Sequence, residues 1–203
     1  MKKWIVIATV LMLAVPAMAQ FAGLPIAGGA AAPEAMEAGV SGGVVLGNDI
    51  NLYGGRMGFA PMAGLVFFGD IGALDPDDGD MGWSVQGGAQ YTLPVDLPVD
   101  LALRGVLGWG GYDLEVEGDV TWVNVNGGLV ISKAIDIVTP YAFVGLNYTD
   151  ATATVGHIEV SEDQTDFAGT IGLSVAVTDP VSIYGEYSYI DDSFFGFGAR
   201  VKF

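Results

Sequence analysis

The chain has 203 residues, with 24 acidic against 7 basic side chains and a formal net charge of -17 at pH 7. That charge repels phosphate, so we expect no nucleic-acid partner. The absence of cysteine excludes disulfides and cysteine-based zinc sites. A hydrophobic content of 51% argues against an acidic disordered chain and allows one domain with a sizeable core.

The first 19 residues have the three parts of a secretory signal peptide. Lys2 and Lys3 form the basic start, residues 4–15 the apolar stretch and residues 17–19 a small-residue cleavage site. The apolar stretch is too short to be a transmembrane anchor. We therefore expect export by the Sec route, with Gln20 as the first mature residue.

Residues 20–37 are rich in Ala, Gly and Pro and are predicted to be a flexible lead-in. The sequence leaves open whether this lead-in hangs free or enters the interior of the domain that follows. That domain covers residues 38–203, where apolar residues alternate with small or polar ones at a period of two, as in strands with two different faces. The last segment is the clearest example, with Phe195, Phe197, Ala199, Val201 and Phe203 on one face and Gly196, Gly198, Arg200 and Lys202 on the other.

Alternation of this kind fits either a soluble β-sandwich or a membrane β-barrel. Small polar residues on the second face, acidic residues concentrated in alternate connections and aromatic residues near strand ends favour the barrel. The aromatic residues form two expected rims: Trp83, Trp109, Tyr148, Phe167, Tyr187 and Phe195 form one, and Phe59, Tyr91 and Phe203 the other. We expect an all-β, up-and-down transmembrane antiparallel barrel in the outer membrane of a bacterial cell.

The alternation predicts ten strands, at about 38–46, 49–59, 64–74, 81–93, 99–110, 120–132, 137–148, 166–178, 181–190 and 194–203. An even strand number places both ends of the barrel on the periplasmic side. Eight strands remain the alternative, with residues 38–59 the easiest hairpin to discard. The ten-strand reading puts 16 of the 24 acidic residues at the extracellular end, where residues 149–165 form the longest expected loop.

The closing segment Gly196-Phe197-Gly198-Ala199-Arg200-Val201-Lys202-Phe203 resembles the last strand of small outer-membrane β-barrels. That superfamily includes the OmpA-like transmembrane domain and porin-like proteins, and the resemblance covers about residues 38–203. It implies that the terminal aromatic, Phe203, is the signal read by the barrel-assembly machinery.

Five charged residues point into the expected lumen, namely Arg56, Asp70, Arg104, Glu186 and Arg200. The predicted register places Glu186 diagonally beside Arg200, and Arg56 in a similar relation to Asp70. Two hypotheses follow. The charges either form a network that fills a narrow barrel, or they line the constriction of a pore.

Other candidate sites are weaker. His157, the single histidine, lies in the expected loop at residues 149–165 among acidic residues and is interpreted as solvated rather than catalytic. Asp75, Asp77, Asp78 and Asp80 form an acidic turn that departs from an EF-hand loop and are weak metal candidates. We expect no catalytic residue, no resident metal and no cofactor.

The sequence thus favours a non-enzymatic outer-membrane barrel that is structural or passes small solutes through a narrow pore. The first alternative is surface recognition or ion binding by the acidic extracellular loops. A lipid-modifying barrel enzyme using His157 and a soluble exported β-sandwich remain as rivals. The expected partners are outer-membrane lipid and the barrel-assembly machinery, and the expected state is a monomer.

Overall fold

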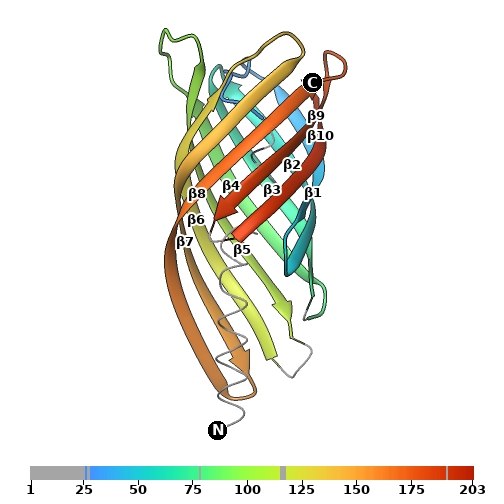
Figure 1. Cartoon of the computed structure of the whole chain (residues 1–203), viewed down its shortest axis with the longest axis vertical. Coiled ribbons are helices and arrows are strands. Elements are labelled where there is room, and N and C mark those ends of the chain that lie inside the picture. Colours follow the sequence, from blue (N-terminus) through green and yellow to red (C-terminus); the bar gives the residue numbers. More distant parts are fainter. Residues whose placement is uncertain (1–25, 27, 78, 115–117, 191) are drawn as a thin grey trace.

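The protein folds into one closed barrel of antiparallel strands (Figure 1). The structure is a computed structural model and describes residues 26, 28–77, 79–114, 118–190 and 192–203; the expected signal peptide lies outside the described residues. The strands are β1 (Ala38–Leu46), β2 (Ile50–Met62), β3 (Leu65–Pro76), β4 (Gly82–Thr92), β5 (Asp100–Asp113), β6 (Gly118–Ser132), β7 (Val138–Val155), β8 (Ile158–Ala176), β9 (Val181–Ile190) and β10 (Asp192–Lys202). The prediction of ten strands rather than eight is therefore confirmed.

Each strand pairs with its neighbours in the chain, and β1 pairs with β10 to close the barrel. The backbones of Ala38 and Phe203 exchange two hydrogen bonds of 2.9 Å, so the two ends of the barrel domain meet at one rim. The even strand number makes this the periplasmic rim. Within the described ranges there is no helix long and apolar enough to cross a membrane.

The expected loop at residues 149–165 is not a loop, and this prediction was wrong. β7 and β8 continue through it as paired strands as far as the pair Val155 and Ile158, and a two-residue turn joins them. Gly156 has φ of 64° there, a left-handed conformation that glycine adopts at no steric cost. The hairpin projects beyond the other strands at the end opposite the carboxyl terminus (Figure 1). Its outward face is polar, so it lacks the apolar alternation by which the other strands were recognised.

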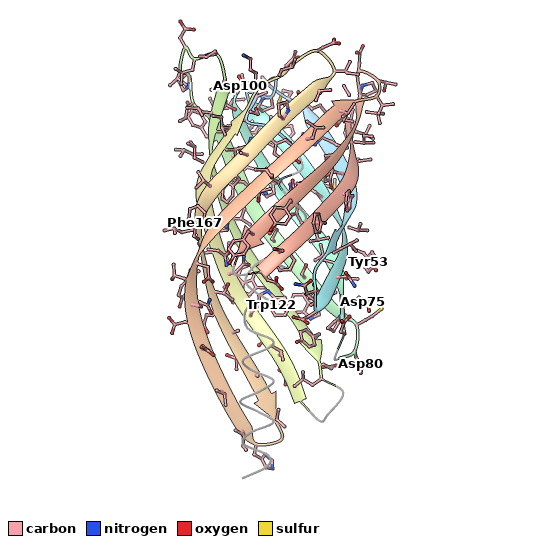
Figure 2. The ribbon with its side chains drawn as sticks, viewed as in Figure 1. Tyr53, Asp75, Asp80, Asp100, Trp122 and Phe167 are labelled. Carbon is pink, nitrogen blue, oxygen red and sulfur yellow. The ribbon has the colours of Figure 1, made fainter. Side chains whose placement is uncertain are left out.

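Side chains of the inward face fill the extracellular end of the lumen. We call this group the extracellular cluster; it consists of Val45, Ile50, Leu52, Leu74, Leu114, Val120, Trp122, Ala151, Ala153 and Phe194. Leu52 and Leu74 are fully buried within it, and Trp122 is 2% exposed. Trp122 lies toward the same end of the barrel as Asp75 and Asp80 and away from Asp100 (Figure 2). Apolar side chains packed in this way exclude water, so the extracellular cluster closes the extracellular end of the lumen.

The chain itself fills the periplasmic half of the lumen. Residues 26 and 28–33, which we call the lumen segment, lead from the interior of the barrel to its rim, where Ala32 is exposed. Ala30 is fully buried and belongs to a second apolar cluster with Ala102, Val130, Phe143, Ala168 and Ile190, against which Ile26 packs. Near the rim, the N–H of Gly64 donates to the carbonyl of Pro33 at 3.1 Å. The structure thus decides the point that the sequence left open, because this part of the lead-in enters the lumen.

Candidate functional site in the barrel lumen

The five charged residues expected in the lumen all project from inward-facing positions of the barrel wall. They come from β2, β3, β5, β9 and β10, and we call them the charged belt: Arg56, Asp70, Arg104, Glu186 and Arg200. All are buried except Arg200, which is half-buried. The belt lies between the extracellular cluster and the periplasmic rim.

Arg56 and Asp70 form a bidentate ion pair inside the barrel. They stand directly opposite each other on β2 and β3, one step closer than the diagonal relation that the sequence predicted. The Nε and Nη2 atoms of Arg56 each donate to a carboxylate oxygen of Asp70 at 2.7 Å. The side-chain amide of Gln86, opposite Asp70 on β4, donates to the same carboxylate. Paired and hydrogen-bonded, the buried carboxylate avoids the cost of an isolated charge.

Glu186 accepts hydrogen bonds from two sides of the lumen. The hydroxyl of Tyr141 on β7 donates to one of its oxygens at 2.8 Å, and the backbone N–H of Ile26 donates to the other at 3.0 Å. The predicted diagonal relation with Arg200 was wrong, because the register puts Gly196 opposite Glu186. Arg200 therefore lies four positions further along β10. The register differs from the predicted one because β10 begins at Asp192, whereas the sequence predicted that it begins at residue 194.

Arg104 has an aromatic neighbour. Its guanidinium carbon lies 4.3 Å from the ring centroid of Phe68, and that of Arg56 lies 4.6 Å from the same centroid. A cation over an aromatic ring is attracted by the ring quadrupole, by about 0.5–2 kcal/mol. Phe68 thus contacts both arginines within the belt.

Polar side chains of the wall bind the backbone of the lumen segment. The Nη1 atom of Arg56 donates to the carbonyl of Ile26 at 3.1 Å, and the N–H of Ala30 donates to Ser132 Oγ at 2.7 Å. Gln90 Nε2 donates to the carbonyl of Gly29 at 3.1 Å, and Thr92 Oγ1 donates to that of Ala30 at 2.8 Å. Sequence reasoning missed Gln90, Thr92 and Ser132 as contacts of this segment. Their inward period-two positions were the available signal, but that signal does not show what they bind.

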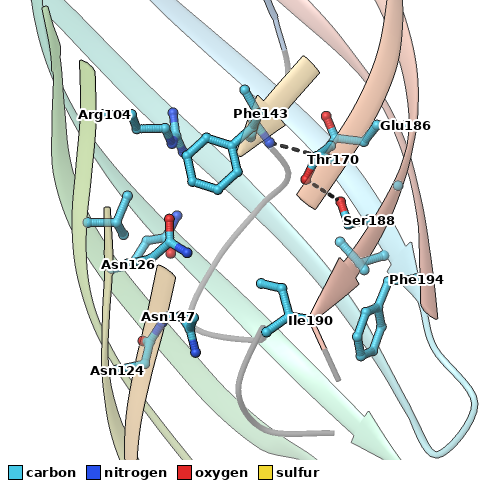
Figure 3. Close-up of a pocket in the computed structure, with 15 residues that line it drawn as sticks. Arg104, Asn124, Asn126, Phe143, Asn147, Thr170, Glu186, Ser188, Ile190 and Phe194 are labelled. Carbon is cyan, nitrogen blue, oxygen red and sulfur yellow. Dashed lines mark hydrogen bonds between the residues drawn. The ribbon is translucent and has the colours of Figure 1, made fainter. Parts of the chain in front are cut away.

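Two cavities lie in the lumen, and Arg104 and Ile26 line both of them. The first has a volume of about 70 Å³ and is lined by amides and hydroxyls together with Phe194 of the extracellular cluster. Figure 3 shows Arg104 and Glu186 entering this cavity from different sides. The second has a volume of about 120 Å³ and lies toward the periplasmic end, between the charged belt and the lumen segment.

The weaker candidates are scattered over the extracellular end. His157 is exposed in the two-residue turn between β7 and β8. Asp75 pairs with Asn51 near the end of β3. The backbone N–H of Asp77 donates to the carbonyl of Asp49 between β1 and β2, whereas that of Asp80 donates to the carbonyl of Asp113 at the end of β5. Asp78 lies outside the described residues. Within the described part of the chain, no three His, Cys, Asp or Glu side chains gather as metal ligands would.

The outer surface of the barrel is covered with apolar side chains. The larger exposed examples include Met57, Phe67, Ile71, Leu103, Leu107, Val144, Leu146, Phe167, Ile171, Leu173, Ile183, Phe195, Phe197 and Val201. The residues of both expected aromatic rims are exposed as well. A closed barrel with polar and charged groups inside and an apolar exterior is the arrangement that a lipid bilayer stabilises. The protein is a β-barrel of the bacterial outer membrane.

Among solved structures, the chain is similar to several outer-membrane barrels. The translocator domain of the autotransporter NalP from Neisseria meningitidis is 10% identical, with a TM-score of 0.50 over 83% of this chain and 87% of that one. The amino-terminal barrel domain of OprF from Pseudomonas aeruginosa is 14% identical, with a TM-score of 0.43 over 84% and 100%. Ail, the attachment invasion locus protein of Yersinia pestis, is 17% identical, with a TM-score of 0.44 over 83% and 99%.

At sequence identities this low, the similarity shows the fold alone and assigns no function. No known sequence family and no curated protein matches this outer-membrane barrel. The expected resemblance to small outer-membrane barrels is confirmed at the level of architecture, and the role of the lumen has to be argued from its own residues.

Proposed function

We propose that the protein is a non-enzymatic, structural barrel whose lumen is sealed by its own chain. The observation that carries this proposal is the lumen segment, whose backbone bonds to Arg56, Gln90, Thr92, Ser132 and Glu186. The extracellular cluster supports it from the other end, because a solute entering there meets buried apolar side chains. Among the described residues, the lumen is thus obstructed at both ends, and the two cavities found in it are small, about 70 and 120 Å³.

Conductance in planar lipid bilayers tests this proposal. We expect the purified mature protein to be electrically silent. Steady conductance steps that change in Arg104→Ala would contradict the seal and support narrow, porin-like passage of small solutes instead.

A single cysteine reports directly on the lumen segment, because the chain has no cysteine of its own. We expect Ala30→Cys to react with a maleimide much more slowly than Ala32→Cys, because Ala30 is fully buried whereas Ala32 is exposed. Adding Gly29→Val should accelerate labelling of Cys at position 30 by at least about tenfold, since tenfold corresponds to only about 1.4 kcal/mol of easier opening. A Cβ on Gly29 would lie 2.5 Å from Ser132 Oγ. Equal labelling at both positions in the unmodified background would show that the segment does not occupy the lumen.

A second candidate function is recognition at the cell surface by the β7–β8 hairpin. Asp150 and Asp163 stand directly opposite each other and are both exposed, with Glu159 and Glu162 nearby on β8. Like charges at opposite positions destabilise an isolated sheet. A basic partner surface would relieve this repulsion, and the sequence has no Lys or Arg between residues 134 and 199.

The test uses an oligolysine peptide as a defined basic probe in a binding assay at low salt. We expect Glu162→Gln combined with Asp163→Asn to weaken binding, while Asp96→Asn at the periplasmic rim leaves binding unchanged. Equal weakening by both variants would indicate an effect of net charge alone and would remove the hairpin from consideration.

A further inference from the structure

The basic side chains of this acidic protein converge on one cavity. The described residues include five lysines and arginines, namely Arg56, Arg104, Lys133, Arg200 and Lys202. All of them except Lys133 line the cavity of about 120 Å³ in the periplasmic half of the lumen, together with one carboxylate, that of Glu37. A chain with a formal net charge of -17 therefore encloses a basic compartment.

Two of these cations have carboxylate partners at short distance. Arg56 binds Asp70 at 2.7 Å, and Lys202 binds Glu37 at 3.0 Å near the rim. The guanidinium of Arg200 packs against the lumen segment, since a Cβ on Gly28 would lie 2.5 Å from one of its nitrogens. These contacts hold three of the four cations in place around the cavity.

Arg104 differs from the others. The residue is only 8% exposed, and among the described residues its close contact is the ring of Phe68, with no hydrogen bond or ion pair to a carboxylate. Gln90 and Gly128, which flank it directly on β4 and β6, supply no negative charge. A cation–π contact contributes about 0.5–2 kcal/mol. The nearest carboxylates, those of Asp70 and Glu186, act on Arg104 only at longer range, because the first is bonded to Arg56 and the second to Tyr141 and the N–H of Ile26. A buried ion that lacks a directly bonded counter-charge costs several kcal/mol, so the ring alone does not balance Arg104.

The cavity has space for a counter-ion. A single water needs about 10–15 Å³ by the same kind of measure, whereas this cavity has about 120 Å³. Gln90 lines it beside Arg104 and adds an amide donor. An anion there would accept charge-assisted hydrogen bonds from the guanidinium, which are stronger than bonds between neutral groups.

We propose that the larger lumen cavity is a binding site for a small inorganic anion, a halide or an oxyanion, held by Arg104. Arg56 and Arg200 add to the positive potential, and the lumen segment closes over the ion, because Gly28, Gly29 and Ala31 line the same cavity. The site shares the lumen segment with the proposed seal and rests on that part of the proposed function, but anion binding at Arg104 is measured separately from conductance.

Anomalous X-ray scattering tests the site directly. Crystals of the refolded mature protein are grown with sodium bromide, and a second set with sodium selenate. We expect an anomalous peak within hydrogen-bond distance of the Arg104 guanidinium in at least one set, and the set that shows it identifies the anion as halide or oxyanion. Peaks confined to the protein surface, or no peak in either set, would overturn the proposal.

Thermal unfolding in detergent micelles provides the solution test. Replacing gluconate by chloride or sulfate at constant ionic strength should raise the Tm of the wild type, because an anion that binds only the folded state stabilises it. Arg104→Gln should abolish that rise, and Lys133→Gln, outside the cavity, should keep it. An equal rise in all three proteins would mean a general salt effect and no site. This outcome differs from failure of the seal, which would appear as conductance whatever the anion.

Discussion

Arg56 is one of the residues that join the barrel wall to the lumen segment. Its guanidinium donates hydrogen bonds to both oxygens of Asp70 on the neighbouring strand and to the carbonyl of Ile26 in the lumen. It also lies over the ring of Phe68. The planar guanidinium presents several donors in a fixed geometry, which lysine does not. A residue in this position couples two parts of the molecule that lie 30 positions apart in the sequence.

The Arg56–Asp70 pair leads to a stability prediction. Arg56→Met leaves the buried carboxylate of Asp70 without its partner, and we expect a loss of about 3–5 kcal/mol in the free energy of unfolding. Adding Asp70→Asn removes the charge and preserves an acceptor for Gln86, so most of the loss should be recovered. Urea unfolding in lipid vesicles, followed by tryptophan fluorescence, measures both effects. Additive losses in the double variant would show that the two residues do not act as a pair.

At this scale the sequence predicted which charges face inward but not what most of them contact. Inward direction follows from counting along one strand, whereas a contact depends on a second strand. Arg56 and Asp70 were placed near each other because a short turn joins their strands. The contact of Glu186 with Tyr141, 45 positions away, has no local signal.

The β7–β8 hairpin is the element that departs most from a uniform barrel. β6 accompanies it outward, since Gly118 pairs with Val155, so β7 is flanked on both sides up to its end. Between β8 and β9 the described register ends at the pair Gly169 and Tyr189. The part of β8 from residue 158 to 168 therefore presents an open edge above the barrel, where one row of backbone groups faces solvent.

Hydrogen exchange should reveal this edge. We expect alternate backbone amides between residues 158 and 168 to exchange quickly, because every second N–H of an edge strand points away from its partner. Amides of residues 150–155 in β7, flanked by β6 and β8, should be protected. Mass spectrometry or NMR of the folded protein in micelles distinguishes the two segments. Uniform protection along β8 would mean that another chain covers the edge.

The whole molecule is a closed ring of hydrogen-bonded strands, sealed where β1 meets β10. Phe203, the expected assembly signal, is exposed at the end of that seam and bonds through its backbone to Ala38. Closure leaves no strand edge within the bilayer, where an unsatisfied backbone group would cost several kcal/mol. The ring therefore opens only as a unit.

Heat-modifiable gel migration follows from this closure. Protein taken from outer membranes in SDS without boiling should keep its barrel and migrate differently from the boiled sample. Gly29→Val, which disturbs the contact of the lumen segment with Ser132 and leaves the strand pairing of the wall in place, should still show the shift. Identical migration of both samples, with the protein in the soluble periplasmic fraction, would exclude a closed membrane barrel.

The sequence by itself favoured ten strands over eight and determined the two faces of the wall and the inward direction of all five belt residues. Alternation with a period of two is a property of each strand, and it can be read locally. It failed where the outward face no longer meets lipid, as in the hairpin from residue 149 to 165, because membrane contact was the source of the apolar signal.

Only the tertiary structure decided what fills the barrel. The lumen segment occupies a space that exists once ten strands have closed, and its bond to Glu186 spans 160 positions of the chain. The same closure brings Arg104, Arg200 and Lys202 around one cavity. These contacts depend on the curvature and register of the complete ring, and no single segment of the sequence contains that information.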